Sequence, residues 1–134
     1  MKNQDKFIRF VRRKCKQLGV QFTIGKGRTV LFMGEGSDGF FTPPDKWGPG
    51  ELKVAKKCEN FILTVAHEYV HMLQWFFEDP IYTDGDYYKL EKKTERDAQK
   101  LLKDWNIPAR DRERAARMSK KYLHWLKEKR DADL

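Results

Sequence analysis

The stretch Asn60–Glu78, NFILTVAHEYVHMLQWFFE, decides how the rest of this chain is interpreted. On an α-helix its apolar residues would cover most of the circumference, which predicts a buried helix. The strongly polar side chains recur at helical spacing and predict one narrow stripe along an apolar rod: Thr64, His67, Glu68, His71, Gln74 and Glu78. Asn60 can cap the start of this helix, and Asp79-Pro80 is expected to end it.

The polar stripe contains the motif His67-Glu68-Tyr69-Val70-His71. Residues four apart on a helix share one face, so His67 and His71 can direct their rings at one metal ion. The pattern is HExxH, in which two imidazoles bind zinc and the carboxylate, here Glu68, is the general base for a water molecule. Burying these groups without partners would cost on the order of several kcal/mol, and a metal ion facing a water-filled cleft removes that cost.

A third metal ligand must come from another part of the chain, because catalytic zinc usually takes three protein ligands. No histidine follows the motif at a short interval, and no cysteine follows it at all. A carboxylate on the next predicted helix, 89–105, is therefore the expected donor. Glu91 and Glu95 are the candidates, one helical turn apart on the same face. If one of them binds the metal, the other can hydrogen-bond a ligating histidine.

Two further helices are predicted at the ends of the chain. Residues 5–18 form an amphipathic pattern with an apolar face, which Gly19 ends: Phe7, Phe10, Val11, Cys15 and Leu18. Residues 109–130 carry a second apolar face, opposite a face of Arg and Lys, and are expected to pack on the body: Ala115, Met118, Tyr122, Trp125 and Leu126. We therefore expect one α+β domain over residues 1–134.

The strands are predicted before the central helix. Residues 20–24 and 29–33 are rich in β-branched and apolar residues, and the turn residues between them predict a hairpin. Residues 51–55 alternate polar and apolar side chains and predict a short strand, whose lysines suit a sheet edge that could pair with an extended peptide. Residues 34–39 match GxGxxG, but the segment 40–44, FFTPP, cannot begin a helix, so we interpret them as a hairpin loop.

Composition limits the possible functions without selecting one. The 134 residues carry a net charge of +8, concentrated in residues 2–16 and 110–130, so a nucleic acid or an acidic partner is possible. No apolar run approaches the roughly 18 residues of a membrane span, and the start lacks the pattern of a signal peptide. We therefore expect a cytoplasmic protein without membrane contact. Cys15 and Cys58 form no CxxC pattern and are interpreted as buried or idle thiols.

A family resemblance covers roughly residues 50–108. The segment 60–74, with ILTVAHEYVHMLQ at its centre, is followed by Glu95-Arg96-Asp97-Ala98, then by Leu101-Leu102 and Ile107-Pro108. This succession resembles the small HExxH zinc metallopeptidases of the ImmA/IrrE type and related phage-encoded minimal proteases. The resemblance implies a minimal zincin-like, gluzincin-like fold: an N-terminal helix, a small mostly antiparallel sheet, an active-site helix and a ligand helix, which the basic C-terminal helix would follow.

The same resemblance implies roles for individual residues. His67, His71 and Glu95 would bind Zn²⁺, and Glu68 would be the general base. Glu91 is the second choice for the third ligand, because its spacing from the motif resembles that of thermolysin-like proteins. Val70 stands where the family often has glycine, a difference that we expect to affect the shape of the cleft more than metal binding.

The expected activity is zinc-dependent hydrolysis of a peptide bond in a protein substrate, for instance a repressor or a DNA-associated protein. A tyrosine, Tyr82, Tyr87 or Tyr88, or else His124, could stabilise the negative charge of the reaction intermediate. The alternative is a zinc-containing regulatory or nucleic-acid-associated binding protein without proteolysis. The basic end helices could bring either protein to DNA.

Overall fold

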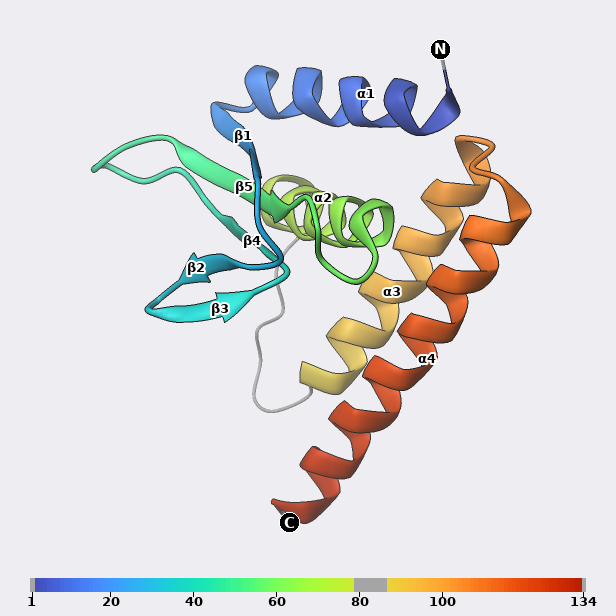
Figure 1. Cartoon of the computed structure of the whole chain (residues 1–134). Coiled ribbons are helices and arrows are strands. Elements are labelled where there is room, and N and C mark those ends of the chain that lie inside the picture. Colours follow the sequence, from blue (N-terminus) through green and yellow to red (C-terminus); the bar gives the residue numbers. More distant parts are fainter. Residues whose placement is uncertain (1, 79–86, 134) are drawn as a thin grey trace.

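The computed structural model describes residues 2–78 and 87–133 (Figure 1). In this part of the chain the elements are α1 (Asn3–Gln17), β1 (Val20–Gly25), β2 (Val30–Phe32), β3 (Glu35–Ser37), β4 (Gly39–Thr42), β5 (Gly50–Ala55), α2 (Phe61–Phe77), α3 (Tyr87–Asp104) and α4 (Ala109–Ala132). The expected α+β class is confirmed, and each predicted helix is present within a few residues of its predicted bounds. None of the described helices is long and apolar enough to cross a membrane.

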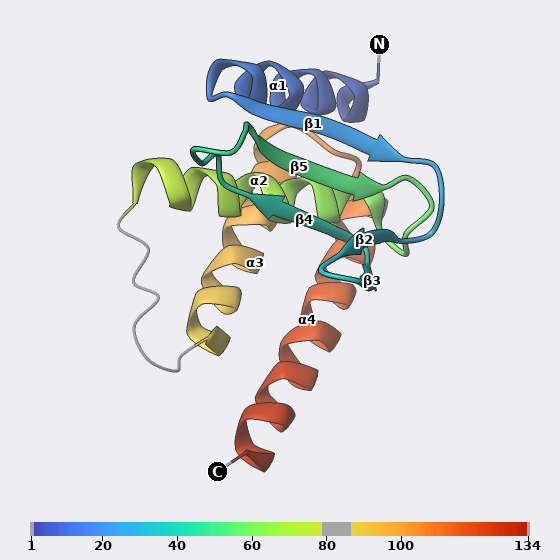
Figure 2. The same ribbon diagram turned by 90° about the vertical axis from the view of Figure 1, so that its left-hand side faces the viewer.

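The strands form two small sheets. The larger sheet has the order β1-β5-β4, in which β1 is parallel to β5 and β4 is antiparallel to it. β2 and β3 form a separate antiparallel pair. Helix α2 lies across one face of the larger sheet, and the opposite face looks toward the viewer in Figure 2. The larger sheet is therefore mixed, whereas a mostly antiparallel sheet was expected.

Two predictions of strand pairing are wrong. The predicted hairpin of residues 20–24 with 29–33 does not form, because β1 pairs with β5 and β2 pairs with β3. The predicted edge strand, β5, is the central strand of its sheet. The alternation of polar and apolar residues reports which face of a strand is buried, and it carries no information about the neighbouring strand. With β5 in the centre, β4 becomes the edge strand next to α2.

The segment that matches GxGxxG contains β3 and the first residue of β4. A strand therefore follows its last glycine, Gly39, in place of the helix that a nucleotide-binding loop requires. Gly39 has another role, since an added Cβ would lie 2.9 Å from both the Lys53 carbonyl oxygen and Thr64 Cγ2. The absence of a side chain lets β4 approach α2 one helical turn before His67.

Helix α1 closes the hydrophobic core with its apolar face. Phe7, Val11 and Cys15 are fully buried, and the Phe7 ring contacts the rings of Tyr69 on α2 and Trp105 after α3. Cys15 and Cys58 are both free thiols, as the sequence predicted, and Cys58 is only partly buried. Burial raises the pKa of the Cys15 thiol to about 11, so this cysteine is protonated and unreactive in the folded protein.

We expect Phe7→Ala to destabilise the protein by about 3–5 kcal/mol, because the removed ring leaves a cavity between three elements. The measurement is the free energy of unfolding from urea titration. Phe77→Ala is the matched control, because this ring is 69% exposed; its expected change is within about 0.5 kcal/mol. Equal losses of unfolding free energy in the two variants would contradict the packing of Phe7 in the core.

Candidate metal centre

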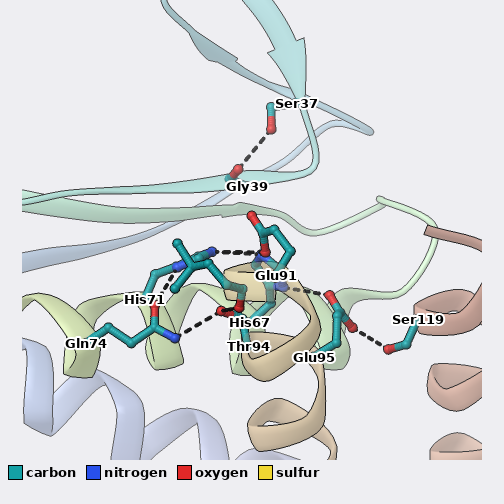
Figure 3. Close-up of polar contacts among 10 residues, drawn as sticks. Ser37, Gly39, His67, His71, Gln74, Glu91, Thr94, Glu95 and Ser119 are labelled. Carbon is teal, nitrogen blue, oxygen red and sulfur yellow. Dashed lines mark hydrogen bonds and ion pairs between the residues drawn. The ribbon is translucent and has the colours of Figure 1, made fainter. Parts of the chain in front are cut away.

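Helices α2 and α3 bring the two histidines of the motif and the two candidate glutamates together (Figure 3). His67, Glu68 and His71 come from α2, whose first turn is capped by the Asn60 side chain accepting a hydrogen bond from the Leu63 N–H, at 3.1 Å. Glu91 and Glu95 are both buried on α3. The predicted polar stripe of α2 therefore faces the predicted polar face of α3.

Three possible ligand atoms converge between the two helices. The Nε2 atoms of His67 and His71 are 3.0 Å apart, and Glu91 Oε2 lies 3.4 Å from the first and 3.5 Å from the second. Glu91 Oε2 is buried and has no hydrogen-bond partner among the described residues. Two imidazoles and one carboxylate with converging donor atoms could hold a metal ion.

Glu95 lies behind His67. Its Oε1 is 2.7 Å from His67 Nδ1, and its Oε2 accepts a hydrogen bond from the hydroxyl of Ser119 on α4. A carboxylate at Nδ1 holds the proton of the neutral imidazole there and leaves Nε2 free to bind a metal. Glu95 therefore orients a candidate ligand, and Ser119 orients Glu95.

A second chain of hydrogen bonds lies behind His71. Its Nδ1 is 3.0 Å from Gln74 Oε1, and Gln74 Nε2 donates to the Thr94 hydroxyl at 3.0 Å. Thr94 in turn donates to the Leu90 carbonyl oxygen at 2.9 Å, so the arrangement is anchored on the backbone of α3. An amide oxygen can only accept, which places the His71 proton at Nδ1 and turns its Nε2 lone pair toward Glu91 and His67.

The electrostatics of this group favour a positive charge at its centre. Burial alone would lower the pKa of His67, but its hydrogen bond to the Glu95 carboxylate and the charges of Glu68 and Glu91 outweigh burial and raise the pKa to about 9. Burial would likewise raise the pKa of Glu91, but the neighbouring His71, His67 and Tyr87 outweigh it and lower the pKa. A bound cation would supply the same positive charge and would give Glu91 Oε2 a partner.

Glu68 faces a pocket next to these atoms. The pocket has a volume of about 830 Å³ and is lined by residues from β2 to β4 and from α2, α3 and α4, among them His67, Glu68, His71 and Glu91. The Glu68 side chain makes no hydrogen bond or ion pair to another residue in the described ranges. Burial raises the pKa of its carboxyl, and the nearby His67 and His71 oppose that shift. Such a carboxylate is free to accept a proton from a molecule in the pocket.

Two tyrosines line the same pocket, Tyr87 on α3 and Tyr122 on α4. Partial burial and the adjacent Glu91 raise the pKa of Tyr87 to about 12, and the pKa of Tyr122 is also raised by burial and Glu91. Both hydroxyls therefore keep their protons and remain donors. His124 lies away from the pocket, because its side chain is 72% exposed and pairs with Glu128. Tyr88 stacks under Arg130, and Tyr82 falls outside the described residues.

The group of converging atoms that could hold a metal ion contains Glu91, whereas Glu95 was the first choice for the third ligand. Glu91, the second choice, lies next to the Nε2 atoms of His67 and His71. Glu95, the first choice, contacts Nδ1 of His67 instead. Sequence reasoning also missed Ser119 and the role of Gln74. Ser119 places a hydroxyl on the otherwise apolar face of the last helix, between Met118 and Tyr122. A polar residue on an apolar face is the sequence feature that could have indicated its role.

In comparisons of this chain with family models, with curated proteins and with solved structures, no match was found.

We expect Glu95→Gln to weaken the binding of Zn²⁺ by about 10- to 100-fold, because it removes a charged partner of a ligating histidine. Glu91→Gln should weaken binding further, because it removes the carboxylate that faces both Nε2 atoms. Dissociation constants are measured by competition with a chromogenic chelator. Glu128→Gln is the control, an exposed glutamate far from the pocket that should leave the affinity unchanged. A larger loss in Glu95→Gln than in Glu91→Gln would restore Glu95 as the ligand.

Proposed function

We propose that this protein is a zinc-dependent metallopeptidase with a minimal zincin-like fold. The observation that carries the proposal is the position of Glu68, an unpaired carboxylate in a pocket beside a group of two histidines and one glutamate that could hold a metal. A catalytic metal site in a hydrolase requires three protein ligands, an accessible side and a nearby general base. His67, His71 and Glu91 meet the first requirement, and the pocket and Glu68 meet the others.

The donor set favours zinc. Two imidazoles and one carboxylate are a ligand combination of catalytic zinc sites, whereas magnesium and calcium prefer oxygen ligands alone. Glu95 and Gln74 support this choice, because a ligating histidine usually donates its second N–H to a carboxylate or an amide. Bound zinc would supply a Lewis acid that makes water more acidic and polarises a carbonyl group.

The protein residues would carry the proton and hold the reacting group. Glu68 would take the proton of the attacking water and pass it to the amine that leaves. The raised pKa of Glu68 suits the first step, because a carboxylate with a raised pKa is a stronger base toward the water proton. Its carboxyl form is still far more acidic than the ammonium ion of the leaving amine, so it can pass that proton on. Tyr87 and Tyr122 line the pocket as protonated donors, and one of these hydroxyls would stabilise the negative charge on the carbonyl oxygen.

A protein segment fits the pocket better than a small polar substrate. Aromatic side chains line it at several points, among them Phe41 on β4 and Trp125 on α4. β4 is the edge strand of the larger sheet on the side of the pocket, so its outer backbone groups could pair with an extended peptide beside α2. The substrate would therefore be an extended stretch of polypeptide with apolar side chains.

Glu68→Gln should keep the bound zinc and lose peptide hydrolysis by about 10²- to 10⁴-fold, because it removes only the general base. The measurement combines zinc content per chain with the cleavage of an unstructured peptide library, followed by mass spectrometry. Glu59→Gln is the control, because Glu59 also lines the pocket and undergoes the same substitution. It should cleave at the wild-type rate.

Two outcomes would contradict the proposal. Full activity of Glu68→Gln would exclude Glu68 as the base. A wild-type protein that binds zinc stoichiometrically and cleaves no member of the library would favour the alternative, a zinc-containing binding protein without proteolysis.

A further inference from the structure

Helix α1 and Lys2, the residue before it, carry a positive charge that is almost uncompensated. Residues 2–17 contain seven basic side chains and one acidic side chain, Asp5, so they account for +6 of the net charge of +8. By contrast, α4 interleaves nine basic residues with four acidic ones. The positive charge of α1 is therefore the least compensated along the sequence.

The basic residues of α1 form a regular stripe. Five of them follow intervals of four and three residues and share one helix face, all exposed: Lys2, Lys6, Arg9, Arg13 and Lys16. This face is opposite the buried Phe7, Val11 and Cys15. None of these five cations makes an ion pair with another residue in the part of the chain that the structure describes. Five aligned charges without partners repel one another, and an external polyanion would relieve that repulsion.

We infer that the exposed stripe of α1 binds the phosphate backbone of a nucleic-acid duplex. A helix rises about 1.5 Å per residue, so the stripe extends over roughly 20 Å. Duplex DNA presents about one negative charge per 1.7 Å of its axis, and neutralising phosphates with Lys and Arg supplies most non-specific affinity. The stripe therefore matches the charge and the linear shape of such a partner.

A lipid surface is a weaker candidate. A helix that lies on a membrane needs an apolar face to insert between the lipids. The apolar face of α1 is used in the core, where Phe7 contacts Tyr69 and Trp105. None of the large apolar side chains that are exposed in the described residues belongs to α1.

The stripe is separate from the proposed peptidase site. No residue of α1 lines the pocket that contains Glu68. In Figures 1 and 2, α1 lies along the side of β1 that faces away from β4, while α3 and α4 extend in the opposite direction. The inference therefore goes beyond the proposed function, and either can fail without the other.

The test measures fluorescence anisotropy of a labelled duplex of about 20 base pairs and mixed sequence, from about 50 to 200 mM salt. The variant is the triple substitution Lys6→Gln, Arg9→Gln and Lys16→Gln in the full chain. The control triple removes the same residue types and the same charge from exposed positions of α4: Arg114→Gln, Lys120→Gln and Lys127→Gln. Zinc affinity and circular dichroism establish that both variants are folded.

We expect the wild-type protein to bind the duplex with an affinity that falls steeply with salt. The α1 triple should lower the slope of log K against log salt by about 2.7, since each lost phosphate contact removes about 0.9. The control triple should change the slope by less than half of that amount. Tenfold or greater loss of affinity in the α1 triple alone would support the inference.

Three results would overturn the inference. The first is an equal loss of duplex affinity in the two triple variants, which would reflect net charge alone. The second is no binding of the duplex by the wild-type protein even at the lowest salt. The third is tighter binding to vesicles of phosphatidylserine and phosphatidylcholine than to the duplex, lost in the α1 triple, which would assign the stripe to anionic lipid.

Discussion

The candidate site depends on one electrostatic constraint, the convergence of two imidazoles and one carboxylate in a largely buried place. His67 and His71 direct their Nε2 atoms at one another at 3.0 Å, and an unpartnered oxygen of Glu91 faces both. Lone pairs and a negative charge at these distances repel unless a proton or a metal cation lies among them. The raised pKa of His67 agrees with protonation when no metal is bound. Both Nδ1 atoms are held by acceptors, Glu95 and Gln74, so neither imidazole can relieve the repulsion by turning. A metal ion bound there would give all three groups a partner at once.

The rest of the fold supplies the rigid surroundings that this arrangement needs. α2 packs against the larger sheet and α3, because most of its side chains are apolar and buried. Gly39 lets the edge strand β4 approach α2 closely, which forms one wall of the pocket. α3 and α4 form the other wall. The polar groups therefore project from elements that are held by packing well outside the site.

The sequence predicted the parts of this structure that depend on local periodicity. The helices and the convergence of His67, Glu68 and His71 follow from the spacing of apolar and polar residues along one helix. Strand pairing did not follow, because β1 pairs with a strand that begins 30 residues later and the period-two pattern does not encode partners. The sequence also could not predict which of Glu91 and Glu95 lies next to the Nε2 atoms. Residues one turn apart share a helix face, and only the position of α3 along α2 decides which one comes close.

The hydrogen bond from Ser119 to Glu95 has a consequence for the biosynthesis of the protein. A chain grows from its N-terminus, so α2 and α3 leave the ribosome before α4. The three candidate ligands can come together at that stage, but one oxygen of Glu95 lacks its partner until α4 has docked. A nascent chain that ends before Ser119 would hold Glu95, and through it His67, less firmly. If the candidate site binds a metal, docking of α4 would therefore be expected to raise the affinity, because it gives Glu95 its second partner.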